Sequence, residues 1–94
     1  MQQKHVTPIH PGKVLQDELE EIAISSDTLA QHIGISPTII HEVCNGKREI
    51  TAPLAMKLSR ALGASPQFWL NLQNNWELSQ VNESDYRNIK SIAA

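Results

Sequence analysis

Apolar residues recur along the chain with the spacing of amphipathic helices, and no stretch alternates apolar and polar residues as a strand does. The pattern starts after Pro11, where Leu15, Leu19 and Ile22 follow one another at helical intervals. Proline is typical of a helix start, so we predict a first helix over residues 11–22. Residues 1–10 have no such periodicity, and we expect an extended N-terminal arm there.

Start and stop signals predict four more helices. A serine or threonine oxygen accepts a hydrogen bond from a first-turn N–H, proline is favoured at the first helical position, and glycine is favoured where a helix ends. The pairs of signals are Ser25 or Ser26 with Gly34, Ser36-Pro37 with Asn45-Gly46, Thr51 with Gly63, and Ser65-Pro66 before a pattern that runs to Leu78. The chain is therefore predicted to be all-α, with five helices joined by short turns.

The residues around Gly34 have the spacing of a helix-turn-helix unit. Two helices that cross over a short turn need glycine at the bend, a small residue where the backbones come closest, and apolar contacts on both sides. Gly34 and Ala30 meet the first two requirements. The apolar contacts are Leu29, Ile33, Ile35, Ile40 and Val43.

In such a unit the second helix enters the major groove of DNA, and its outward side meets the bases. Threonine can bond a base edge or touch a thymine methyl group, histidine can donate to guanine or to a phosphate, and glutamate can accept from cytosine N4. The candidate base-contacting residues are Pro37, Thr38, His41 and Glu42. Capped helix starts and basic side chains suit phosphates, and these candidates are Ser26, Ser36, Asn45, Lys47 and Arg48.

Each of these assignments has a structural alternative. Thr38 and His41 are also typical of a solvated helix face, and Asn45 of a helix stop. Lys47 is of a type common on any protein surface. A carboxylate at Glu42 repels phosphates unless a base pairs with it, so an electrostatic or structural role is an equal alternative.

A catalytic interpretation rests on Cys44 and His41, which lie three residues apart on one helix. A nucleophilic cysteine needs a base and a third, orienting group, and the sequence offers no obvious third group. A small residue after Val43 suits the core better. No enzyme activity is predicted, and because the histidines lack metal-ligand spacing, no metal or cofactor is expected.

Composition and charge refine this picture. A chain of 94 residues with 40% hydrophobic residues is expected to form one domain, and with 4% aromatics a homodimer is expected to add buried surface. The formal net charge is −2, but residues 32–60 carry Lys47, Arg48, Lys57 and Arg60 against Glu42 and Glu49, a net charge of +2. A local positive face is therefore expected. Without a membrane-length apolar run or a signal-peptide pattern, the protein is expected in the cytoplasm.

Several blocks together resemble the HigA-type antitoxins, or virulence-associated protein I group, of the Xre helix-turn-helix regulators. The blocks are IHPG at 9–12, LA at 29–30, GIS at 34–36, NGKR at 45–48, IT at 50–51 and SPQFWLNLQ at 65–73. The resemblance covers residues 9–78 and implies a five-helix, lambda-repressor-like fold. It also implies an antitoxin that binds a ribonuclease toxin encoded beside it and represses the shared operon as a dimer on operator DNA.

The chain departs from that family at the start of the third helix. It has Pro37-Thr38 where relatives often have Arg-Gln, and His41-Glu42 where they often have a small residue and Asp. At these positions the chain then lacks a side chain that can form two hydrogen bonds with one guanine or adenine. Two alternatives remain open: a toxin-binding module with weak DNA binding, and a stand-alone transcriptional regulator without a toxin.

The last predicted helix and the tail carry apolar residues beyond what one helix stripe needs. Trp69 and Trp76 are candidates for the dimer interface; alternatively, both complete the monomer core. Residues 79–94 have apolar residues at three-residue steps from Tyr86. This tail is either a short sixth helix on the dimer or a segment that orders on the toxin.

Overall fold

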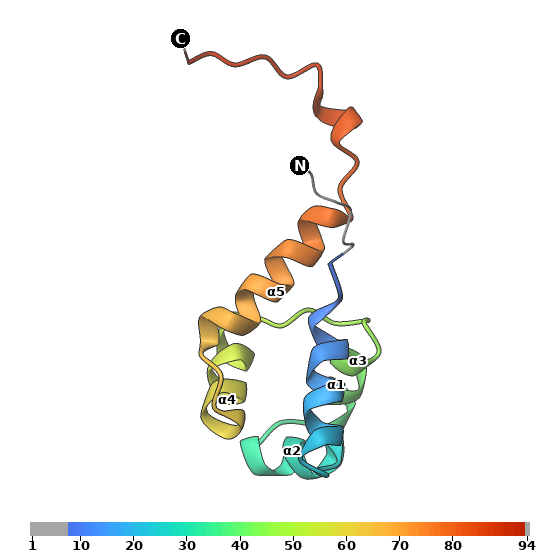
Figure 1. Cartoon of the computed structure of the whole chain (residues 1–94), viewed down its shortest axis with the longest axis vertical. Coiled ribbons are helices and arrows are strands. Elements are labelled where there is room, and N and C mark those ends of the chain that lie inside the picture. Colours follow the sequence, from blue (N-terminus) through green and yellow to red (C-terminus); the bar gives the residue numbers. More distant parts are fainter. Residues whose placement is uncertain (1–7, 94) are drawn as a thin grey trace.

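The structure is a computed structural model that describes residues 8–93. This part of the chain contains five α-helices and one 3₁₀ turn, and no strand (Figure 1). The elements are α1 (Pro11–Glu21), α2 (Ser26–Ile33), α3 (Pro37–Cys44), α4 (Ala52–Leu62), α5 (Pro66–Ser79) and the 3₁₀ turn η1 (Glu83–Tyr86). The predicted all-α fold is confirmed. Most of the expected N-terminal arm, residues 1–7, lies outside the described residues.

The predicted caps begin the later helices. The Ser36 hydroxyl accepts from the Thr38 N–H of α3 at 3.2 Å, and the Ser65 hydroxyl accepts from the Phe68 N–H of α5 at 3.1 Å. For α2 the sequence left two candidates, and Ser25 is the cap, accepting from Thr28 N–H at 3.0 Å. Ser26 is instead the first residue of α2, and it is half-buried.

The start of α1 depends on His10, a role that the sequence analysis did not assign. Its Nδ1 accepts a hydrogen bond from the Gly12 N–H at 2.9 Å, which caps the helix where Pro11 begins it. Gly12 is buried against the end of α3, and a Cβ at this position would lie 1.7 Å from the Val43 carbonyl oxygen. Only glycine lets the two backbones approach this closely.

The prediction that Ile22 extends the apolar stripe of α1 is wrong. Leu15 and Leu19 are buried, but Ile22 is 45% exposed. The helix ends at Glu21, and Ala23 takes a left-handed backbone conformation with φ 59°. The chain turns away before Ile22 can face the core.

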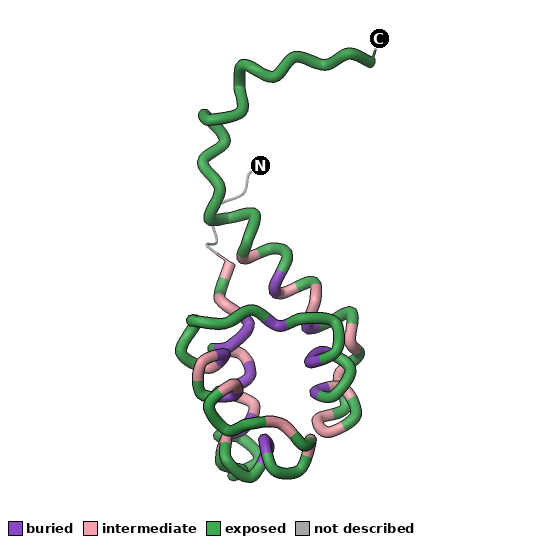
Figure 2. Tube along the Cα trace, turned by 180° about the vertical axis from the view of Figure 1, so that it is seen from behind, coloured by how far each residue is buried: buried purple, intermediate pink, exposed green. Residues whose placement is uncertain are grey.

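One hydrophobic core joins all five helices (Figure 2). Trp69 of α5 is 1% exposed within the single chain, so its predicted place in a dimer interface is wrong, because the monomer already covers it. Trp76 is half-buried and meets the His10 ring edge to face, with the ring centroids 4.6 Å apart. This contact fixes the entry of α1 against α5.

Beyond α5 the chain leaves the helical body. The tail runs away from the other helices (Figure 1), and every described residue from Gln80 to Ala93 is exposed. The only helical element in the described tail is the 3₁₀ turn η1, and the single chain tests neither a short sixth helix on the dimer nor ordering on a toxin. In the described part of the chain, no helix combines the length and apolar character needed to cross a bilayer.

Candidate nucleic-acid interface

Helices α2 and α3 form the predicted helix-turn-helix unit. Gly34 has φ 76°, a left-handed conformation that suits glycine, and the Ile35 N–H donates to the Ala30 carbonyl oxygen at 3.0 Å. Lys57 of α4 donates to the Ile33 carbonyl oxygen at 2.9 Å, which satisfies a free acceptor at the end of α2. A hydrogen bond to α2 and another from α4 therefore both stabilise the turn.

Burial gives α3 one inner and one outer side. Ile40 and Val43 are fully buried, as the spacing predicted. Pro37, Thr38 and His41 are exposed on the outer side. Helix α3 thus presents an exposed outer side, as the second helix of a helix-turn-helix unit does where it enters a major groove.

Two of the four candidate base-contacting residues already have partners. His41 Nε2 lies 2.8 Å from Asp27 Oδ1 of α2. Glu42 is half-buried, and its Oε1 accepts from Arg48 Nε at 2.8 Å and lies 2.7 Å from Arg48 Nη2. Of these four candidates, Pro37 and Thr38 are the two that take part in no ion pair within the described residues.

The candidate phosphate-binding residues fall into two groups. Ser36, Asn45, Lys47 and Arg48 lie at the start of α3 and in the loop after it, and all four are exposed. Lys47 has no ion pair within the described residues. Ser26 lies at the start of α2 and lines one pocket together with Asn45.

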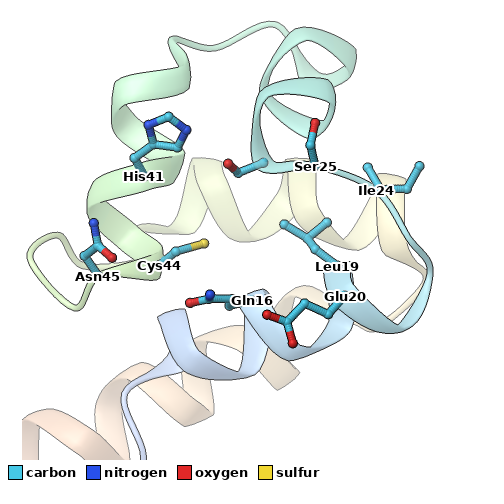
Figure 3. Close-up of a pocket in the computed structure, with 9 residues that line it drawn as sticks. Gln16, Leu19, Glu20, Ile24, Ser25, His41, Cys44 and Asn45 are labelled. Atoms are coloured by element: carbon cyan, nitrogen blue, oxygen red, sulfur yellow. The ribbon is translucent and has the colours of Figure 1, made fainter.

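Cys44 lies in a pocket of 290 Å³ between α1, the start of α2 and α3 (Figure 3). The lining residues are Gln16, Leu19, Glu20, Ile24, Ser25, Ser26, His41, Cys44 and Asn45. Burial raises the pKa of the Cys44 thiol, so the unreactive thiol form is favoured at neutral pH. His41 Nε2 lies 2.8 Å from Asp27 Oδ1, so Asp27 could orient His41, a group that the sequence analysis did not identify. His41 has no hydrogen bond to Cys44 within the described residues, so nothing in this arrangement activates the Cys44 thiol.

The sequence analysis missed Gln73, which ties the α3–α4 loop to α5. This side chain is 4% exposed; its Oε1 accepts from the Ile50 N–H at 2.8 Å, and its Nε2 donates to Glu77 Oε2 at 3.0 Å. The α3–α4 loop, which carries Lys47, is therefore held to α5 at Ile50, near the start of α4. One signal was available, because Gln73 is a polar residue one helical turn after Trp69, on the inward side of α5.

Known proteins match this arrangement. The family model for the helix-turn-helix HTH_3 matches residues 15–69. Antitoxin HigA-1 of Vibrio cholerae is 40% identical over 72 residues, 76% of this chain and 68% of that protein. Virulence-associated protein I of Dichelobacter nodosus is 38% identical over 85 residues, 89% of this chain and 78% of that protein.

A solved structure agrees as well. The Pseudomonas aeruginosa antitoxin HigA, in a structure with the higBA promoter, has a TM-score of 0.85 and 33% identity, and the match covers 93% of this chain and 99% of that chain. The expected lambda-repressor-like fold is thereby confirmed. The relatives found are described as HTH-type transcriptional regulators, virulence-associated proteins and antitoxins. The chain therefore belongs to the HTH_3 helix-turn-helix family, in which its relatives include HigA antitoxins and virulence-associated protein I.

Proposed function

We propose that this chain is the antitoxin of a toxin–antitoxin pair, a homodimer that represses its own operon and neutralises a ribonuclease toxin by binding it. The observation that carries the proposal is the free outer side of α3 in a helix-turn-helix unit whose inner side is buried. The likeness to an antitoxin solved with its promoter supports it.

On the operator, α3 lies in the major groove. Thr38 bonds a base edge or touches a thymine methyl group, and Pro37, which has no N–H, makes apolar contact with such a methyl group. His41 donates to a base or a phosphate after leaving Asp27. Lys47, Ser36 and Asn45 contact phosphates and fix the register of the helix on the duplex.

The dimer forms through the α5 side of the molecule. Trp76 contributes to this interface, since its ring is only half-covered by His10 and its own chain. A two-fold dimer places two copies of α3 about 34 Å apart, one turn of DNA, and predicts a palindromic operator. Sedimentation of the purified chain at several concentrations tests the dimer, and a concentration-independent monomer would contradict it.

A mobility-shift titration of the chain's own promoter, repeated at increasing salt, tests DNA binding. Phosphate contacts release counterions, so affinity is expected to fall steeply and linearly on a log–log plot. A flat salt response, or equal affinity for unrelated DNA, would contradict the proposal. Addition of the product of the neighbouring gene tests the toxin: it should form a complex with this chain and lose its ribonuclease activity.

A toxin-binding module with weak DNA binding is the second candidate function. One observation favours it: His41 pairs with Asp27, so DNA must compete with this pair for the His41 side chain. This candidate predicts a tight toxin complex and no promoter shift. A stand-alone regulator predicts the reverse, a promoter shift with no short basic reading frame beside the gene.

A further inference from the structure

The pair between Glu42 and Arg48 joins a residue of α3 to the loop that follows it. The two residues are six apart, a separation that does not bring side chains together on a helix. They meet because the chain reverses at Gly46, which has φ 75°, and the Lys47 N–H returns to the Glu42 carbonyl oxygen at 2.8 Å. The pair is a product of this turn.

Two nitrogens of Arg48 take part in the contact with Glu42. Arg48 Nε and Nη2 both approach the same carboxylate oxygen, Oε1, at 2.8 and 2.7 Å. A guanidinium group has five N–H donors, so three remain without a partner in the described structure. Glu42 therefore fixes the plane of the guanidinium group and leaves it able to bind a second acceptor.

Two opposing effects on DNA binding follow from the Glu42 carboxylate. Its charge repels nearby phosphates and weakens binding. Its hold on Arg48 removes rotamer freedom from a long side chain before DNA arrives, so less freedom is lost on binding. Repulsion of phosphates by Glu42 acts whatever residue stands at position 48. The positioning effect exists only while residue 48 is arginine.

We propose that Glu42 is a positioning residue for Arg48, which it orients towards a phosphate, and that it does not read a base. This inference rests on the proposed DNA binding. It predicts that removal of a negative charge at residue 42 weakens binding to the promoter, the opposite of what simple repulsion predicts.

Promoter affinity of Glu42→Ala, Glu42→Gln and Glu49→Gln, measured at one fixed salt concentration, tests the proposal. Glu49 is the matched control, since it is exposed beside Arg48 and has no ion pair within the described residues. Glu42→Ala should weaken binding about two- to fivefold, the range of one exposed ion pair. Glu42→Gln, which keeps an acceptor oxygen, should weaken it less, and Glu49→Gln should leave it equal or tighter.

The same substitution in an Arg48→Ala background gives the sharpest outcome. Only repulsion then remains, so Glu42→Ala should tighten binding instead of weakening it. An equal effect in both backgrounds, or tighter binding by Glu42→Ala alone, would overturn the positioning role while leaving DNA binding intact. Failure of the unmodified chain to bind its promoter would overturn the proposed function and this inference with it. Thermal unfolding of each variant confirms that it is folded.

Discussion

At the residue scale, Gly12 packs closely against the backbone at the end of α3. A methyl group at this position would overlap the Val43 carbonyl, which is backbone and cannot rotate away. Gly12→Ala should therefore lower the free energy of unfolding by about 1–3 kcal/mol, the usual cost of overpacking. Urea unfolding of the unmodified chain and of Gly12→Ala measures this difference in free energy.

The neighbouring Lys13→Ala is the matched control for that substitution. Lys13 is exposed and pairs with Asp17 at 3.2 Å, an exposed contact four residues along the helix that contributes only about 0.3–0.5 kcal/mol. Equal effects of the two substitutions would show that α1 can shift away from α3.

His10 gives the fold a dependence on pH. Burial lowers the pKa of His10, and its Nδ1 must be deprotonated to accept the Gly12 N–H. The unfolded chain, where the pKa is about 6.5, therefore binds this proton first as pH falls. The stability contributed by His10 is present above about pH 6.5 and is lost as pH falls towards the lowered pKa of the folded state.

Urea unfolding of the unmodified chain and of His10→Asn, at neutral and mildly acidic pH, isolates this contribution. Asparagine can cap the helix but does not titrate. The unmodified chain should lose more stability on acidification than His10→Asn. Identical losses would contradict the assigned role of His10.

At the element scale, the loop between α3 and α4 depends on α5 through Gln73. Gln73→Met keeps the size of the side chain but leaves the buried Ile50 N–H without its acceptor, at a cost of about 1–3 kcal/mol. Hydrogen exchange at the Ile50 amide should accelerate, and promoter binding should weaken because Lys47 is less well placed.

Gln67→Met is the control on the same helix. Gln67 is exposed and its Nε2 donates to Asn71 Oδ1 at 2.9 Å; it has no hydrogen bond to the loop within the described residues, so this variant should change little. Unchanged exchange at Ile50 in Gln73→Met would show that the loop is held without Gln73.

The elements were largely predictable from sequence because their signals are local. Serine and threonine caps, proline at the first helical position and glycine at the bend act within one turn of chain, and four later helices begin where these signals predicted. Ile22 was misplaced because periodicity alone does not show that α1 stops at Glu21. Trp69 was misplaced because spacing does not distinguish a core tryptophan from an interface one.

The candidate site was predictable only in part. The outer side of α3 follows from helical spacing around Ile40 and Val43. The contacts that these residues make do not follow from helical spacing. His41 pairs with a residue of another helix, and Glu42 pairs with a residue beyond a turn. Such contacts depend on tertiary structure.

At the scale of the whole molecule, a helical body carries an exposed tail. Residues 80–93 contribute no side chain to the core, so a chain truncated after Ser79 should unfold with a free energy within about 0.5 kcal/mol of the full chain at low concentration. A larger loss that grows with protein concentration would show that the tail packs on a second copy. Thermal and urea unfolding at several concentrations distinguish these outcomes.

The central claim is that the outer side of α3 and the loop after it bind DNA. Quantitative binding of Thr38→Ala and Lys47→Ala to a set of promoter variants, across salt concentrations, tests it most directly. Lys47→Ala should weaken binding to every sequence alike and reduce the salt slope by about one, whereas Thr38→Ala should change the preferred base at one position of each half-site. Unchanged affinity, preference and slope in both variants would contradict the claim.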